Sequence, residues 1–163
     1  MKKILTVVLC VLALGITAGQ AQVRQGQTAV GANLVYGSRT ESLGLGARFQ
    51  YGILDHVRAE VGFNHFFEHN HMAIWDVNLN GHYLIGLLQE RLQVYPIGGL
   101  NYTMLDYKGI DNYKGEENHI GLNVGAGVEY ELTEHLGVNM EYRHTIVRKV
   151  AQGVVALGIN YKF

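Results

Sequence analysis

A short histidine-rich segment offers side chains that could bind a metal ion. These are His65, Glu68, His69 and His71. Imidazole and carboxylate groups bind zinc and other transition metals, and histidine also binds haem iron. Their spacing matches no recognised zinc motif, so two interpretations stay open: a metal- or haem-binding loop, and a solvated polar loop. We expect no bound cofactor, and His65, His69 and His71 are the candidate ligands if a metal binds.

A second, larger set of residues carries charge. It comprises Arg48, Arg58, Glu60, Asp76, Glu129, Glu131, Glu141, Arg143 and Lys162. Neighbouring carboxylates can act as general acid and general base in catalysis. The four basic and five acidic side chains of this set nearly balance, which is typical of charges that pair with one another when they are enclosed. The sequence therefore favours a structural charge network, and we assign no catalytic residue.

The composition excludes several classes of protein. A formal net charge of −1 does not fit a protein that binds nucleic acid by neutralising phosphates. A mean hydropathy of +0.04 argues against a bundle of membrane-spanning helices. The single cysteine, Cys10, lies in the N-terminal leader. A mature chain without the leader can form neither a disulfide nor a cysteine-based metal site.

The N-terminal residues have the layout of a secretory signal peptide. Lys2 and Lys3 precede the apolar run Ile4–Ile16, and small residues then lead to Ala21. The alternative is an uncleaved anchor helix, but the run is shorter than the roughly 20 apolar residues that span a bilayer. The sequence predicts a signal peptide over residues 1–21 and an exported domain over residues 22–163.

The rest of the chain alternates between apolar and polar residues with a period of two, which is typical of β-strands. Eight segments show this alternation: Thr28–Gly37, Leu43–Ile53, Val57–Phe67, Ala73–Ile85, Leu92–Met104, His119–Leu132, Leu136–Val147 and Gly153–Phe163. The gaps between them are short, so each connection is expected to be a hairpin between antiparallel neighbours. The prediction is an all-β protein, an eight-stranded antiparallel up-and-down barrel.

The sizes of the side chains indicate which face of this barrel is inside. A soluble barrel buries its apolar face, whereas a membrane barrel turns that face to lipid. The apolar register carries the bulky residues and no Asp, Glu, Lys or Arg, and the other register carries the charged set and most of the 21 glycines. A lumen of eight strands is only wide enough for its own side chains. We therefore expect a transmembrane barrel with bulky residues outside, aromatic residues at both strand ends and a plugged, salt-bridged lumen.

The end of the chain resembles the C-terminal assembly signal of the small outer-membrane β-barrel family of Gram-negative bacteria, the OmpA-type and OmpX-type barrels. Gly158, Tyr161 and Phe163 match its glycine, aromatic and terminal aromatic positions, and the stretch Tyr95–Tyr102 is similar to a strand common in these barrels. The resemblance implies the bacterial outer membrane, insertion by the barrel assembly machinery, N- and C-termini in the periplasm and four longer connections outside the cell. The expected contacts are outer-membrane lipids and lipopolysaccharide, with no nucleic acid and a monomeric chain.

Some barrels of this kind are lipid-A-modifying enzymes, so a catalytic alternative is weighed. The segment from Tyr142 to Ile146 resembles the Arg-His-x-Ser segment of lipid A deacylases, but Ile146 stands where the serine nucleophile is required. Thr145 is adjacent, yet its side chain points to the opposite face of a strand. The favoured function is a non-enzymatic outer-membrane barrel that contributes to envelope integrity or surface contact. The alternatives are a lipid-A-modifying enzyme and a metal- or haem-binding surface barrel.

Overall fold

The strands of the computed structural model coincide closely with the alternating segments of the sequence. The structure describes residues 25–39, 41–69, 72–87, 91–107, 117–147 and 151–163. The strands are β1 (Thr28–Gly37), β2 (Ser42–Leu54), β3 (Val57–His69), β4 (Met72–Tyr83), β5 (Ile85–Leu87), β6 (Leu92–Tyr107), β7 (Glu117–Glu131), β8 (Leu136–Val147) and β9 (Gln152–Lys162). Among these described residues, no helix is long and apolar enough to cross a membrane. The predicted signal peptide lies outside the described part of the chain.

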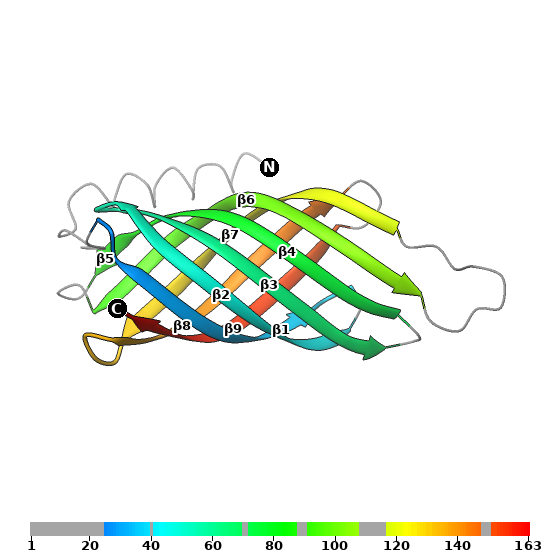
Figure 1. Cartoon of the computed structure of the whole chain (residues 1–163), viewed down its shortest axis with the longest axis horizontal. Helices are drawn as coiled ribbons and strands as arrows, with labels where there is room; N and C mark the ends of the chain where they lie inside the picture. Colours follow the sequence, from blue (N-terminus) through cyan, green and yellow to red (C-terminus); the bar gives the residue numbers. More distant parts are fainter. Residues whose placement is uncertain (1–24, 40, 70–71, 88–90, 108–116, 148–150) are drawn as a thin grey trace, which may run out of the picture.

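The strands close into a barrel. Each strand pairs antiparallel with its neighbour in sequence, β1 pairs with the last strand, β9, and β4 pairs with β6. The short β5 continues β4 beyond a break at Leu84, so β4 and β5 together are the fourth of eight strands. The predicted eight-stranded antiparallel up-and-down barrel is therefore confirmed, except that the predicted strand Ala73–Ile85 is interrupted (Figure 1).

The two ends of the barrel differ. The C-terminus and the start of β1 lie at one end, where the Phe163 amide donates to the Thr28 carbonyl at 2.9 Å. The short turns between β2 and β3 and between β7 and β8 lie at the same end, which we call the turn end (Figure 1). The last residues of β1, β3, β6 and β8 and the first residues of β2, β4, β7 and β9 lie at the opposite end, which we call the loop end.

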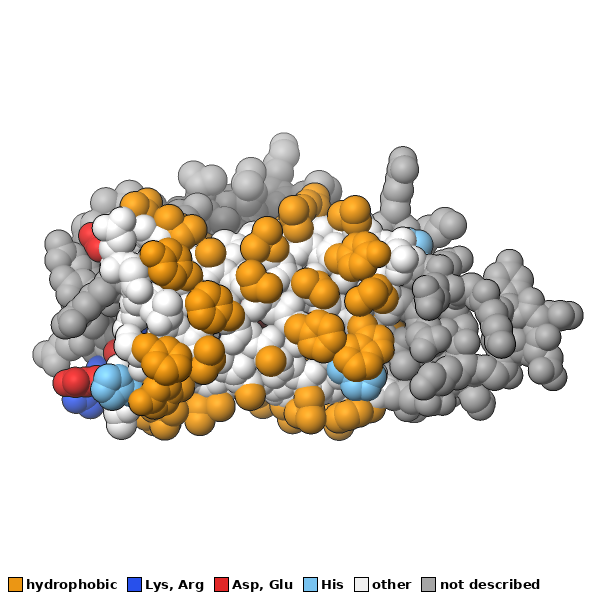
Figure 2. Space-filling model, in the orientation of Figure 1, with side chains coloured by type: hydrophobic (Ala, Val, Ile, Leu, Met, Phe, Trp, Pro, Cys, Tyr) orange, Lys and Arg blue, Asp and Glu red, His pale blue; other side chains and the backbone are white. Residues whose placement is uncertain are grey.

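Alternate side chains of each strand point outwards and into the lumen. On β7, Val124 is 57% exposed whereas its neighbour Asn123 is 1% exposed. Apolar side chains cover the described outer wall in the same way (Figure 2). The outward face of a membrane barrel contacts hydrocarbon, where charged groups are unfavourable. The face assigned from the sequence is thus the outward face of the structure.

Two bulky side chains lie inside the barrel. Phe66 and Tyr95 fall in the inward register by the alternation itself, and each is only 1% exposed and points into the lumen, so the general expectation that bulky residues lie outside fails at these two positions. Each is paired with a glycine of the neighbouring strand: Phe66 with Gly44, and Tyr95 with Gly127. A Cβ atom on Gly127 would lie 2.5 Å from the Tyr95 ring. The glycines provide the space that a narrow lumen otherwise lacks.

Apolar side chains lie inside the barrel at both ends, with polar side chains between them. The loop-end cluster comprises Val35, Phe66, Ile74, Val154 and Ala156. The turn-end cluster comprises Leu84, Tyr95 and Ile97. Along the fourth strand, the buried inward residues are in order Ile74, Asp76, Asn78, Asn80, His82 and Leu84. An apolar cluster thus lies towards each end of the lumen, with the polar centre between the two clusters, and polar side chains such as Gln93 and Lys162 are buried beside the turn-end cluster.

Candidate functional site

The polar centre of the lumen is built by side chains from almost every strand. The inward register of β2, β3, β4, β7, β8 and β9 carries the charged residues expected from the sequence, and all except the partly exposed Glu131 are buried. Because alternate residues of a strand share one face, this placement follows from the period of two. The distances between the charges depend on how the strands are shifted against one another, which the pattern does not give.

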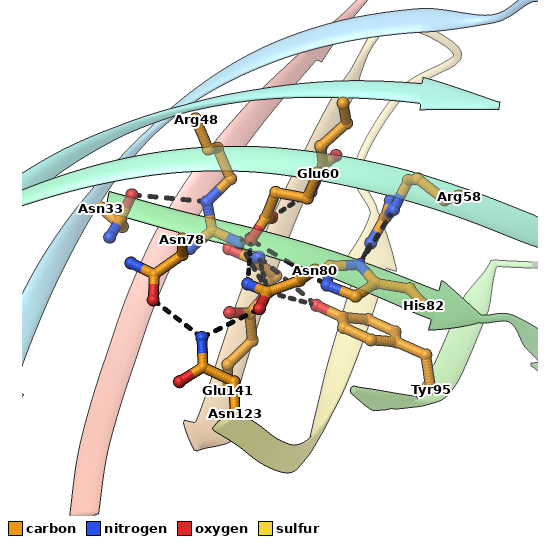
Figure 3. A network of polar contacts seen from close by, with 12 residues as sticks. Asn33, Arg48, Arg58, Glu60, Asn78, Asn80, His82, Tyr95, Asn123 and Glu141 are labelled. Atoms are coloured by element: carbon orange, nitrogen blue, oxygen red, sulfur yellow. Dashed lines mark hydrogen bonds and ion pairs between the residues drawn. The ribbon is translucent and has the colours of Figure 1, made fainter. Parts of the chain in front are cut away.

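Arg48 is the centre of the first group of charges (Figure 3). Its Nη1 atom lies 3.2 Å from Glu60 Oε2 and 2.5 Å from Glu141 Oε1. Its Nε atom donates to Asn33 Oδ1 at 3.3 Å. Glu60 is on β3, next to β2, whereas Glu141 is on β8, which does not pair with β2. The guanidinium group therefore links opposite walls of the barrel.

The second group of charges lies nearer the turn end. Arg58 Nη1 donates to Glu129 Oε2 at 2.9 Å, and Lys162 Nζ lies 2.9 Å from Glu129 Oε1. Lys162 also pairs with Glu131 at 2.5 Å. The Glu131 side chain is 28% exposed, so the second group of charges extends from the lumen to the surface at the turn end. Every charge in the group has a partner of opposite sign.

Asp76 and Arg143 complete the predicted charged set, but they pair differently. Asp76 Oδ1 accepts hydrogen bonds from the side-chain amides of Asn64 and Asn78, both at 2.6 Å. Arg143 is buried in the lumen, and the structure records no ion pair between it and another described side chain. The set therefore divides into two ion-pair groups and two charges outside them.

Histidine and tyrosine take part in the network without having been expected there. The His82 and Tyr95 rings stack with their centroids 4.9 Å apart, and Arg58 lies 5.0 Å from the centre of the Tyr95 ring (Figure 3). The Tyr95 hydroxyl donates to Glu141 Oε1 at 2.9 Å. Reasoning from charge alone missed His82, although its position in the same register as Asp76 was a usable signal.

Asparagine side chains fill much of the remaining lumen. The buried members are Asn33, Asn64, Asn78, Asn80, Asn101, Asn123, Asn139 and Asn160. Asn123 Nδ2, for example, donates to Asn78 Oδ1 at 2.8 Å and to Asn80 Oδ1 at 3.0 Å. An amide both donates and accepts, so it can connect strands without adding charge. The regular spacing of asparagine in the inward register was a signal that the sequence analysis did not use.

One candidate metal ligand, His65, lies towards the loop end of β3. His65 belongs to the outward register, and its ring lies 3.9 Å from the Trp75 ring and 5.9 Å from the Phe67 ring, measured between centroids. His65 therefore packs in an aromatic patch on the outer wall. The side chains of His69 and His71 lie outside the described residues, so the metal- or haem-binding hypothesis remains a prediction.

The segment similar to a deacylase site is split between the two faces of β8. Thr145 points inwards and its hydroxyl donates to Asn123 Oδ1 at 2.8 Å, whereas His144 and Ile146 are exposed on the outer wall. On the outer face, Ile146 therefore follows His144 in the position where the deacylase segment has serine, and its side chain is an alkyl group. An alkyl group cannot act as a nucleophile in acyl transfer.

The residues of the expected assembly signal lie on both faces of β9. Tyr161 points outwards and makes an edge contact with Phe163, with ring centroids 5.2 Å apart. Gly158 is in the inward register, where an added Cβ would lie 2.4 Å from Asn139 Oδ1. The two aromatic rings are therefore on the outer wall at the turn end.

Comparison with known proteins adds to this geometry. Residues 6–163 match the family described as the outer membrane protein beta-barrel domain. The chain belongs to this family. It is 24% identical over 93 residues to outer membrane protein X of Escherichia coli K12, an alignment that covers 54% of each chain. The match thus spans about half the length of that relative.

Solved structures of other proteins show the same fold. The N-terminal β-barrel domain of OprF from Pseudomonas aeruginosa has a TM-score of 0.74 at 19% identity, covering 85% of this chain and 98% of that one. Ail, the attachment invasion locus protein of Yersinia pestis, has a TM-score of 0.61 at 14% identity, covering 86% and 100%. At these identities, the likeness concerns the fold.

Proposed function

We propose that this chain is a non-enzymatic outer-membrane barrel with a closed lumen, which contributes to envelope integrity or surface contact through its outer wall and its connections. The observation that carries this proposal is the filled lumen, in which Arg48 cross-links the polar centre and an apolar cluster lies towards each end. A lumen filled in this way leaves the exterior as the part of the molecule that meets other molecules.

The pairing of charges supports a structural role for the network. Buried charges are tolerated where partners of opposite sign and hydrogen bonds compensate the lost hydration. Arg48, Glu60 and Glu141 satisfy this condition with contacts across the lumen. An ion that passed through the barrel would have to separate these groups. The network would therefore stabilise the barrel and restrict permeation.

The outer wall supports direct contact with membrane lipids. Its exposed side chains include Leu45, Leu79, Leu100 and Leu122, each half-exposed to the surroundings. Burial of such apolar surface in hydrocarbon is favourable, whereas a cation there costs about 2–4 kcal/mol at the midplane. The proposed partners of this wall are outer-membrane phospholipid and lipopolysaccharide. Because lipid covers the wall, we propose that the chain is a monomer.

The orientation follows from the family resemblance. We place the turn end, with both chain termini, in the periplasm and the longer connections outside the cell. The outward Tyr161 and Phe163 at the turn end agree with an assembly signal read by the barrel assembly machinery. Ail is named an attachment invasion locus protein, which supports surface contact as a role for a barrel of this shape.

Planar-bilayer conductance of the refolded protein, combined with a comparison of deletion and complemented cells, tests the proposal. We expect no stable conducting state in the bilayer, and greater sensitivity to bile salts or SDS in cells without the protein. Mass spectrometry of lipid A from the deletion and complemented cells tests whether the protein modifies lipid A. A steady conductance would contradict the closed lumen, and a difference in lipid A acylation would contradict a non-enzymatic role.

A further inference from the structure

Three buried groups face one another where the two ion-pair groups of the lumen meet. One nitrogen or oxygen atom from each of Glu60, His82 and Glu141 lies within 4.8 Å of the other two. His82 Nε2 lies 3.9 Å from Glu60 Oε1, which is beyond hydrogen-bond distance. His82 Nε2 and Glu141 Oε2 are buried and have no hydrogen-bond partner. Each of these two atoms can therefore form one more hydrogen bond, with a small ligand placed between the three groups.

The contact between Arg58 and His82 defines what this ligand must be. Arg58 Nε donates to His82 Nδ1 at 3.3 Å. Because a guanidinium group can only donate, Nδ1 must be the acceptor, and the proton of a neutral ring is then on Nε2. The place between the groups thus presents one N–H donor from His82 and carboxylate acceptors from Glu60 and Glu141.

A metal ion does not fit this arrangement. A metal-bound histidine donates its other ring N–H to a carboxylate, a carbonyl or water, whereas His82 Nδ1 accepts from Arg58. Ligands of tetrahedral zinc are also about 3.4 Å apart, given bonds of about 2.1 Å. The 3.9 Å between His82 Nε2 and Glu60 Oε1 exceeds that separation.

We propose that a single water molecule is bound between Glu60, His82 and Glu141 and connects the two ion-pair groups. Water accepts one hydrogen bond from Nε2–H and donates two to the carboxylates, which satisfies the groups that lack partners. Two atoms that each lie about 2.8 Å from one oxygen can be up to about 5.6 Å apart, and the three atoms here lie within 4.8 Å of one another, so one water can reach all of them. The water links Arg48, through Glu60 and Glu141, with Arg58, through His82.

The surroundings of this site would hold the water for a long time. Along the fourth strand His82 lies between the polar Asn80 and Leu84 of the turn-end cluster. Tyr95 of the same cluster stacks on His82 and donates to Glu141. Ile74 of the loop-end cluster lies further along this strand, on the other side of the site. Exchange of the water with solvent therefore requires movement of packed side chains.

Nuclear magnetic resonance of the refolded chain with ¹⁵N-labelled histidine tests the proposal. We expect His82 to carry its proton on Nε2 and to show a cross-peak to a slowly exchanging water. His56 and His135, in the turns at the end of the barrel, provide the internal comparison and should exchange freely. An unprotonated Nε2, a doubly protonated ring without the water cross-peak, or a shift of His82 signals on refolding with Zn²⁺ would overturn the proposal.

A double-mutant cycle adds a measurement of the connection itself. His82→Phe keeps a ring on Tyr95 but removes Nε2–H, and Glu141→Gln changes the other side of the site. Their effects on the unfolding equilibrium constant should be non-additive by at least about fivefold. In the control cycle, His82→Phe with Asp76→Asn should be additive within about twofold. Additivity in both cycles would contradict a water shared by His82 and Glu141. If a variant fails to fold, the histidine NMR spectrum of the unaltered protein remains the test of the proposal.

Discussion

Replacement of Arg48 by methionine is expected to destabilise the barrel by about 3 kcal/mol. Arg48 Nη1 contacts Glu60 at 3.2 Å and Glu141 at 2.5 Å, so its removal leaves two buried carboxylates without their cation. Loss of one partner from a buried ion pair costs about 3–5 kcal/mol. We expect the lower end of this range because Gln50 still donates to Glu60 and Tyr95 still donates to Glu141, both at 2.9 Å.

The free energy of unfolding can be measured with urea in lipid vesicles. The fluorescence of Trp75, the single tryptophan of the chain, follows unfolding, and heat-dependent gel migration reports barrel closure. The matched control combines Arg48→Met with Glu60→Gln and Glu141→Gln. This triple variant has no unpaired charge at the site, so it should recover most of the lost stability.

Two results would refute the reasoning about Arg48. One is a loss below about 1 kcal/mol in the single variant, which is the size expected for a surface ion pair. The other is a triple variant no more stable than the single variant, because the unpaired carboxylates would then not be the cause of the destabilisation.

Two further substitutions test the outer wall and the packing of the lumen. Val124→Arg should lower the free energy of unfolding in vesicles by about 2–4 kcal/mol, whereas Leu132→Arg, directly after the turn end of β7, should lower it by about 0–1 kcal/mol. Equal losses in vesicle refolding would contradict the assigned depths of these two residues. Gly127→Ala should destabilise the barrel by about 1–3 kcal/mol because its Cβ would lie 2.5 Å from the Tyr95 ring. The same change in a Tyr95→Ala background should cost far less in urea unfolding, and an undiminished cost would exclude this clash as its cause.

The alternation in the sequence was sufficient to predict the strands and their faces. Val124 and Asn123 are adjacent, and their opposite exposure follows from the period of two. The absence of charge from the apolar register indicated lipid on that side, because ions are excluded from hydrocarbon. These inferences depend on neighbours within one strand, which the sequence displays directly.

The remaining features depend on contacts between strands. Tyr95 fits inside only because Gly127 is opposite to it on β7, and this register is not visible along either strand alone. The pairing of Arg48 with Glu141 across the lumen depends in the same way on the shear of the barrel. The interruption of the fourth strand at Leu84 was not visible in the alternation either, because the pairing register continues unchanged across it, from His82 opposite Ile97 to Ile85 opposite Val94.

Spin-label accessibility along β7 tests the central claim most directly. Single cysteines at residues 120–130 can be labelled in the chain from residue 22, which has no cysteine of its own. In lipid vesicles, the labels at even positions should collide often with oxygen, which concentrates in hydrocarbon, and the labels at odd positions should collide rarely. High collision rates at the odd positions, with low rates at the even ones, would contradict a barrel that faces lipid with its apolar side chains and encloses its charges.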